Sequence, residues 1–196
     1  DRRAWGMHLS NLRGATVTDN IVANSLVRDG GYGISISGSS TQTVNNTVLE
    51  NNIVDDFGYA LRVLNEVARD VRIKNNTFIR SSGDLPLIEH KRSGSINGLR
   101  YEGNRYMYRG SGQPFSTGGR DYTFSQWRNL FDSNASSIRG DFVDQSRSLD
   151  TYARSIGLRN ANELFAAMRN QSRTNYNEDL TAAALYDYFK SGYELR

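Results

Sequence analysis

The first half of the chain repeats at an interval of 27 residues, and this repeat limits the fold more than any other feature. Similar segments begin at Trp5, Tyr32, Tyr59 and Pro86. Each repeat holds short β-branched or alternating stretches separated by Gly, Asn, Asp and Ser, with no stretch long enough for a helix. A repeat built only from strands and turns predicts a β-solenoid in which each repeat forms one coil.

Side chains alternate between the two faces of a strand, so position within the repeat predicts burial. Two columns are expected to point inward: Met7, Ile34, Leu61 and Ile88, and then Leu9, Ile36 and Val63. The columns expected to point outward contain His8, Ser35, Arg62 and Glu89, and then Ser10, Ser37, Leu64 and Lys91. The aromatic column of Trp5, Tyr32 and Tyr59 shares the inward parity, which predicts rings stacked inside the solenoid or at a corner. A platform for sugar rings is the alternative.

A second repeated position carries amide side chains. Aligned at the same interval, the column contains Ser25, Asn52, Asn76 and Asn104. Stacked coils lie about 4.8 Å apart, so these side chains are expected to hydrogen-bond from coil to coil as an inward ladder. The same alignment places Thr16 on Thr43.

The repeat ends after Gly112, which predicts two regions. Residues 1–112 are expected to form the coils, and residues 113–196 a remnant of the last coil, an irregular linker and helices at 122–131, 149–156, 160–169 and 177–192. The last coil of a solenoid exposes apolar groups and unpaired strand edges, so the helical region is expected to cap it. The first coil follows Arg3 directly, which predicts that a missing N-terminal portion or another chain stacks on it.

Composition excludes several classes of protein. The 196 residues contain no Cys, which excludes disulfides and Cys-ligated metals. No apolar run approaches the roughly 20 residues of a membrane span. The net charge of +3 is not gathered in basic blocks, which argues against nucleic-acid binding. Nearly all positive charge is guanidinium, which suits carboxylate recognition and also follows from a GC-rich genome.

The coil length, the Asn column and starts such as Gly31-Tyr32-Gly33-Ile34 resemble a right-handed parallel β-helix of the pectate-lyase-like superfamily, over residues 4–112. The resemblance implies a secreted bacterial protein, extracellular or on the cell surface, of which this is the C-terminal part. It implies binding or processing of acidic polysaccharide. If the protein is an enzyme, a lyase or epimerase is the first expectation and a glycoside hydrolase is the second. The superfamily also contains non-catalytic members, so a structural solenoid for cell-envelope assembly or adhesion is the alternative.

The outward column supplies candidates for this chemistry. A uronate lyase or epimerase needs a cation for the sugar carboxylate, a base for the C5 proton and an acid for the leaving oxygen. The predicted catalytic residues are Arg62, Lys91, His8 and Glu89, and the predicted substrate-binding residues are Arg92, Tyr32 and Tyr59. The alternative for Arg62 and Glu89 is a surface salt bridge between neighbouring coils.

Two further positions have competing interpretations. Asp55 and Asp56 precede a new coil, where paired carboxylates with backbone carbonyls suit Ca²⁺ or acid and nucleophile roles in glycoside hydrolysis. Asp selected for turn formation is the alternative. His90 has inward parity, which predicts a hydrogen-bonded core histidine beneath the cap rather than a catalytic one.

Overall fold

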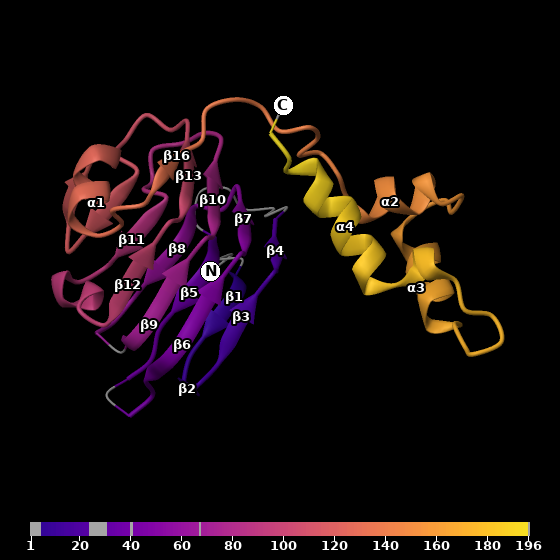
Figure 1. Cartoon of the computed structure of the whole chain (residues 1–196), viewed down its shortest axis with the longest axis horizontal. Coiled ribbons are helices and arrows are strands. Elements are labelled where there is room, and N and C mark those ends of the chain that lie inside the picture. The colour runs from indigo at the N-terminus through magenta and orange to yellow at the C-terminus, as the bar shows by residue number, and fades with distance from the viewer. Residues whose placement is uncertain (1–4, 24–30, 40, 67, 196) are drawn as a thin grey trace. The chain divides into compact units, whose positions relative to one another are not determined.

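The computed structural model describes residues 5–23, 31–39, 41–66 and 68–195, and divides the chain into two compact units. The solenoid unit covers residues 1–138, and the helical unit covers residues 139–196. Figure 1 shows the strands of the first unit stacked in coils and the helices of the second. The fold is therefore mainly β, a parallel β-solenoid followed by helices.

Three sheets run along the solenoid unit. The first sheet has the order β1 (Trp5–Leu9), β5 (Tyr32–Ile36), β8 (Tyr59–Val63), β11 (Ile88–His90), β14 (Phe115–Thr117) and β15 (Arg120–Tyr122). The second contains β2 (Leu12–Arg13), β6 (Val44–Glu50), β9 (Ala68–Lys74) and β12 (Leu99–Glu102), with β3 (Thr16–Thr18) also paired to β6. The third contains β4 (Ile21–Val22), β7 (Ile53–Asp55), β10 (Thr77–Arg80), β13 (Arg105–Tyr108) and β16 (Ser136–Ser137). All pairs are parallel except β14 with β15.

The first sheet confirms the 27-residue repeat. Tyr32 pairs with both Trp5 and Tyr59, and Ile34 pairs with both Met7 and Leu61. The predicted inward columns are buried: the exposed fraction is 0% for Ile34, Ile36, Leu61, Val63 and Ile88. Stacking the coils therefore buries a continuous apolar core.

The predicted stack of aromatic rings is present at the start of the first-sheet strands. The ring centroid of Tyr32 lies 6.0 Å from that of Trp5 and 5.8 Å from that of Tyr59. Tyr32 is only 2% exposed and the Arg62 guanidinium covers its ring, whereas Trp5 is 49% exposed. A Cβ built on Gly33 would be 2.2 Å from Val54 Cγ1, so position 33 faces the core next to Ile34 and the strand departs from simple alternation there.

The second sheet corrects the alignment of the first coil. Thr16 pairs with Val48 rather than with Thr43, and Leu12 pairs with Val44. The spacing from Leu12 to Val44 exceeds 27 residues although Trp5 and Tyr32 are 27 apart, because the turn between the first and second strands is longer in the second coil, at 37–43, than in the first, at 10–11. A fixed interval therefore misplaces the second half of this coil.

The amide ladder exists, but its first member differs from the prediction. Side-chain oxygens and amides join Asn20, Asn52, Asn76 and Asn104 from coil to coil. The predicted Ser25 lies outside the described residues. The residue before each ladder position has left-handed backbone, with φ of 55° at Asp19, 57° at Asn51, 54° at Asn75 and 66° at Gly103. The turn therefore takes Asn, Asp or Gly before an inward Asn.

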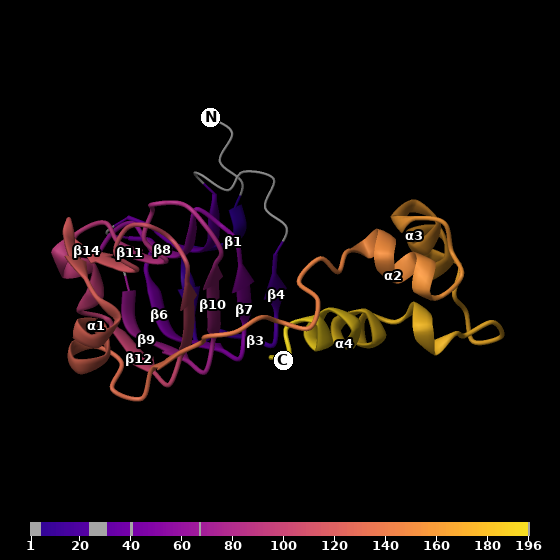
Figure 2. The ribbon, with the colours of Figure 1, turned by 90° about the horizontal axis from the view of Figure 1, so that it is seen from above.

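The coils continue past residue 112 and end under a helix. Strands β14 and β16 extend the first and third sheets, and α1 (Phe124–Leu130) follows a capping box formed by Thr123 and Gln126. Trp127 of α1 is 0% exposed and stacks on Phe115 with ring centroids 4.6 Å apart. Figure 2 shows α1 at the end of the unit opposite β1 and β4.

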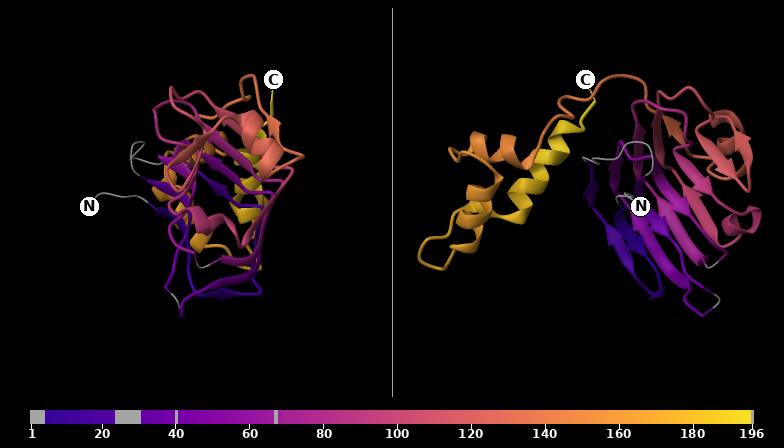
Figure 3. Two further views of the ribbon diagram at one scale, coloured as in Figure 1. Left: turned by 90° about the vertical axis from the view of Figure 1, so that its left-hand side faces the viewer. Right: turned by 180° about the vertical axis from the view of Figure 1, so that it is seen from behind.

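The helical unit contains three of the four predicted helices, and the fourth is α1 of the solenoid unit. The three are α2 (Leu149–Ser155), α3 (Ala161–Arg169) and α4 (Ala182–Gly192), with N-caps Ser148, Asn160 and Thr181. A 3-10 turn (Glu178–Leu180) precedes α4, which therefore starts later than expected. Tyr152, Ala153 and Leu164 form the buried core of this unit, and Figure 3 shows its helices from two further sides. Within the described residues, no helix has the length and hydropathy needed to cross a membrane.

Candidate functional site

The predicted residues that the structure brings together lie on the outer side of the first sheet. The Arg62 guanidinium lies 4.8 Å from the ring centre of Tyr32 and 4.3 Å from that of Tyr59. It donates a hydrogen bond to the Tyr32 hydroxyl at 2.5 Å and forms an ion pair with Glu89 on the next strand. Only 15% of the Arg62 side chain and 20% of the Glu89 side chain are exposed. The salt bridge between coils is therefore present, as part of a partly covered cluster.

This Arg62 cluster, defined as Tyr32, Tyr59, Arg62 and Glu89, also covers a polar group. Ser35 precedes Arg62 in the same outward column, and its buried hydroxyl has no hydrogen-bond partner among the described residues. Burial, followed by the negative charge of Glu89, raises the pKa of Tyr59. At neutral pH Tyr59 is thus a proton donor rather than a base.

The other predicted residues of this face lie at its borders. His8 is exposed, its Nε2 lies 3.1 Å from the Ser37 hydroxyl, and its ring stacks on Trp5 at 4.5 Å. Lys91 and Arg92 follow β11 and are exposed, and neither side chain bonds to another residue in the described part of the chain. The structure therefore does not gather the four predicted catalytic residues at one point.

The predicted calcium residues belong to another sheet. Asp55 ends β7 and is buried, whereas Asp56 has φ of 54° and begins a turn. The Asp56 carboxylate accepts hydrogen bonds from the Ser81 amide at 2.7 Å and from its hydroxyl at 2.8 Å. Across the described ranges, no group of three or more His, Cys, Asp or Glu residues is placed to hold a metal ion. The Asp56 contacts are those of a turn, and the Ca²⁺ site stays a prediction.

His90 is buried in the core, as predicted. Its Nε2 lies 2.8 Å from the Tyr101 hydroxyl, and the Trp127 ring of α1 meets its ring edge-on. Burial lowers the pKa of His90 to about 3. It is therefore neutral at physiological pH, beneath the helix that ends the solenoid.

The second sheet carries a group of arginines that was not predicted from the sequence. Arg72 of β9 and Arg100 of β12 are direct neighbours across the two strands, and both are exposed. Arg13 and Arg69 lie in the adjacent outward column, on either side of Asn45. None of these four guanidinium groups has a hydrogen-bond or ion-pair partner among the residues that the structure describes. We call this group, Arg13, Arg69, Arg72 and Arg100, the arginine face.

The arrangement of the arginine face is electrostatically unfavourable for the isolated protein. Neighbouring strands lie about 4.8 Å apart, and like charges directly opposite each other destabilise a sheet. The nearby cation Lys74 is by contrast paired with Glu50 at 3.0 Å. The segment Val71-Arg72-Ile73 aligns with Leu99-Arg100-Tyr101, so the second-strand repeat carried a signal for this pair.

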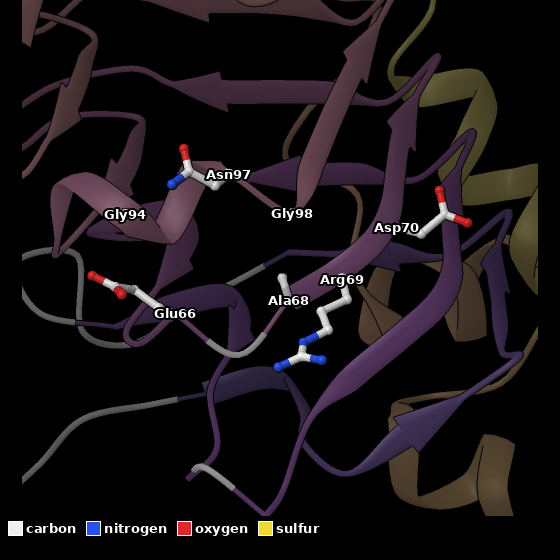
Figure 4. A pocket seen from close by; sticks show the side chains of 7 residues that line it. All are labelled: Glu66, Ala68, Arg69, Asp70, Gly94, Asn97 and Gly98. Atoms are coloured by element: carbon white, nitrogen blue, oxygen red, sulfur yellow. The ribbon is translucent and has the colours of Figure 1, made fainter.

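A surface hollow of about 400 Å³ adjoins the arginine face. Figure 4 shows Arg69 and Asp70 from β9 on one side of it, with Glu66 ahead of that strand and Asn97 and Gly98 facing it. A Cβ built on Gly98 would be 1.7 Å from the Ala68 carbonyl oxygen, so the two coils approach closely here. The hollow is therefore lined by one arginine and two acidic residues.

Comparison with protein-family models, curated proteins and solved structures finds no match to this chain.

Proposed function

We propose that this protein binds an acidic polysaccharide along the arginine face, at an extracellular or cell-surface location. The observation that carries the proposal is the opposed pair Arg72 and Arg100, exposed on neighbouring strands and without a carboxylate partner in the described part of the chain. A polymer with a carboxylate on successive sugars supplies the missing negative charges. Guanidinium groups bind carboxylates with two parallel hydrogen bonds, so the geometry of the contact adds selectivity for carboxylates to the attraction between opposite charges.

The hollow next to the arginine face supports a carbohydrate rather than a simple polyanion. Glu66 and Asp70 line it together with Arg69. Carboxylates accept hydrogen bonds from sugar hydroxyls but repel phosphate or sulfate groups. A uronate offers both a carboxylate for the arginines and hydroxyls for the acids, so it matches the mixed lining of the hollow.

Binding is tested with polygalacturonate and alginate as acidic ligands and dextran as the neutral control, by titration calorimetry at low salt. We expect both acidic polymers to bind and dextran not to bind. Arg72→Gln with Arg100→Gln should weaken binding about tenfold, since each exposed ion pair contributes about 0.2–1 kcal/mol. The melting temperature of this variant should not fall, because the substitution removes a like-charge repulsion.

A matched control separates the arginine face from overall charge. Arg154 and Arg173 are exposed in the helical unit, and Arg154→Gln with Arg173→Gln lowers the net charge by the same amount. This control should bind as the unaltered protein does. Equal weakening by the two double variants would show that overall charge alone attracts the polymer, and the proposal would then be abandoned.

Elimination or epimerisation of the bound uronate remains a proposal for the Arg62 cluster. Arg62 is the cation that would neutralise a sugar carboxylate, and His8, which lies two strands away on the other side of Ser35, is the candidate for proton transfer. Formation of unsaturated uronate from alginate or pectin, lost in Arg62→Ala with the melting curve still cooperative, would support this role. Product formation unchanged in Arg62→Ala would remove Arg62 from it, and binding without product would favour the non-catalytic solenoid.

A further inference from the structure

The second sheet bends at the same position in three successive coils. Gly14, Asn46 and Asp70 have left-handed backbone, with φ of 67°, 47° and 50°. The strand register places these three residues side by side, because the residues directly before them belong to a single column of paired positions. The bends therefore form a row that crosses the strands and follows the axis of the solenoid. We call Gly14, Asn46 and Asp70 the bend row.

Each bend changes which side chains face outward. In β9, Arg69 and Asp70 are exposed, Val71 is fully buried and Arg72 is exposed again. In a regular strand, residues three positions apart lie on opposite faces. The left-handed residue at position 70 therefore brings Arg69 and Arg72 to the same outer face, one on each side of the bend.

The bend row consequently has guanidinium groups on both sides. One flanking column contains Arg13, Asn45 and Arg69, and the other contains Thr16, Val48, Arg72 and Arg100. Left-handed backbone favours Gly, Asn and Asp, so the row between the two columns carries short side chains. The hollow lined by Asp70 and Gly98 adjoins the fourth-coil end of the row. The positive charges of this face thus follow the solenoid axis from the first coil to the fourth.

The direction along a strand is less favourable for a polyanion. Beyond Arg72 in β9 comes Lys74, which is already paired with Glu50 at 3.0 Å. Glu102 lies next to Lys74 on the other neighbouring strand. An acidic polymer that followed β9 past Arg72 would therefore meet two carboxylates around a single cation.

The spacing of the coils suits a sugar chain that follows the axis. Neighbouring strands lie about 4.8 Å apart, and a 1,4-linked pyranose advances its chain by a similar distance. One sugar per coil therefore keeps successive sugars level with successive coils. In an extended, ribbon-like chain, alternate sugars are turned over, so their carboxylates leave the chain on opposite sides. Arginines on both sides of the bend row fit this alternation.

We propose that an acidic polysaccharide lies along the bend row, parallel to the solenoid axis, with one sugar per coil over four coils. The ligand is a segment of a linear 1,4-linked polyuronate at least four sugars long. In the second coil Asn45 and Val48 supply no cation, so only a chain that crosses this coil contacts Arg13 together with the other arginines. The inference rests on the proposed function, to which it adds the direction and the length of the bound chain.

The test compares oligogalacturonates of two, four and six sugars, by titration calorimetry of the full chain at low salt. We expect affinity to rise from two to four sugars and to change little from four to six. Two sugars bind best where Arg69, Arg72 and Arg100 lie together, and do not reach the first coil from there. Arg13→Gln should therefore leave the binding of two sugars unchanged and weaken that of four and six by about threefold, the effect of one exposed ion pair.

A matched control removes the same charge elsewhere in the solenoid unit. Arg120 is exposed on β15 of the first sheet. Arg120→Gln should bind all three oligomers as the unaltered protein does. A melting curve for each variant confirms that the unit is folded.

A gain of affinity examines the uncharged second coil. Asn45→Arg completes the column between Arg13 and Arg69, and should strengthen the binding of four and six sugars by about threefold. Asn129 is exposed on α1, so Asn129→Arg adds the same charge away from this face and should give no gain. No gain from a folded Asn45→Arg variant, or an equal gain from Asn129→Arg, would overturn the inference.

The outcomes separate this inference from the proposed function. If polygalacturonate does not bind, or binds independently of Arg72 and Arg100, the proposed function is wrong and the inference falls with it. If it binds through these two residues but Arg13→Gln weakens all three oligomers alike, or none of them, the chain does not follow the bend row and this inference alone is overturned. Full affinity for two sugars would overturn it in the same way.

Discussion

Asp132 ends the amide ladder by accepting both the backbone and the side-chain amide of Asn104, at 3.2 and 2.9 Å. With the Gly103 amide and the Tyr106 hydroxyl, this fully buried carboxylate satisfies four donors. A ladder of this kind is a chain of hydrogen bonds between polar groups, so its stability depends on whether the polar groups at each end also find hydrogen-bond partners.

We expect Asp132→Ala to destabilise the solenoid unit by about 3–5 kcal/mol, because buried donors lose a charged acceptor. Asp132→Asn should cost less, since one oxygen remains to accept from Asn104. Urea unfolding measures both variants, with Asp121→Ala as a control at an exposed position of the same unit. A loss for Asp132→Ala no greater than that of the control would show that the ladder does not need this end group.

The sequence repeat predicted the solenoid and its inward columns because side-chain alternation and coil stacking act at the same interval in the first sheet. It misplaced the start of the ladder because the turn between the first and second strands differs in length between the first two coils. Asn20, rather than Ser25, therefore meets Asn52. The last coil was missed although Phe115 follows Ile88 at the same 27-residue interval, because β14 is followed by β15 and α1 instead of a strand of the second sheet.

Prediction of the candidate sites from the sequence was likewise limited by how well the strands could be aligned. Arg62 and Glu89 were predicted as neighbours because they occupy one column of a well-aligned strand. The covering of the buried Tyr32 ring by Arg62 was not predicted, because the inward step at Gly33 cannot be read from alternation. The arginine face was not identified because the second strand of each coil was aligned less securely than the first.

Gly33 tests whether the strand is held against the core at this position. A methyl group there would lie 2.2 Å from Val54 Cγ1 and 2.8 Å from the Ala60 carbonyl oxygen. We expect Gly33→Ala to cost about 1–3 kcal/mol through overpacking, and to move Tyr32 against Arg62. Urea unfolding and near-ultraviolet circular dichroism measure the two effects. An unchanged midpoint would mean that the strand is not held inward at this residue.

His90 makes stability depend on pH. Its pKa is about 3 in the folded protein and near 6.5 when unfolded, so the unfolded chain binds an additional proton between these values. The free energy of unfolding should therefore fall as the pH is lowered below 6.5, with a contribution of about 2.5 kcal/mol between pH 7 and pH 4.5. Below pH 3 both states are protonated and this contribution stops growing.

His90→Gln isolates this contribution, because an amide can still bond to the Tyr101 hydroxyl but does not titrate. Urea unfolding at several pH values should give a shallower dependence for the variant than for the unaltered protein. Parallel curves would contradict a buried neutral histidine.

The Arg62 cluster contrasts with an exposed ion pair in the same chain. Arg62→Ala removes the ion pair and the contacts with two tyrosine rings, and leaves Glu89 mostly buried without its partner. We expect a loss of about 2–3 kcal/mol in the free energy of unfolding. Arg159 and Glu163 form an ion pair in which 85% of the arginine side chain is exposed, so Arg159→Ala should leave the urea midpoint nearly unchanged.

A double-mutant cycle over Arg62 and Glu89 separates their mutual interaction from the ring contacts. Glu89→Gln alone should cost less than Arg62→Ala, because the rings keep the guanidinium in place. If the rings hold Arg62 independently, much of the Arg62→Ala loss persists when Glu89 is already Gln. Full disappearance of that loss in the Glu89→Gln background would contradict the contribution of Tyr32 and Tyr59, and would reduce the cluster to a salt bridge between two coils.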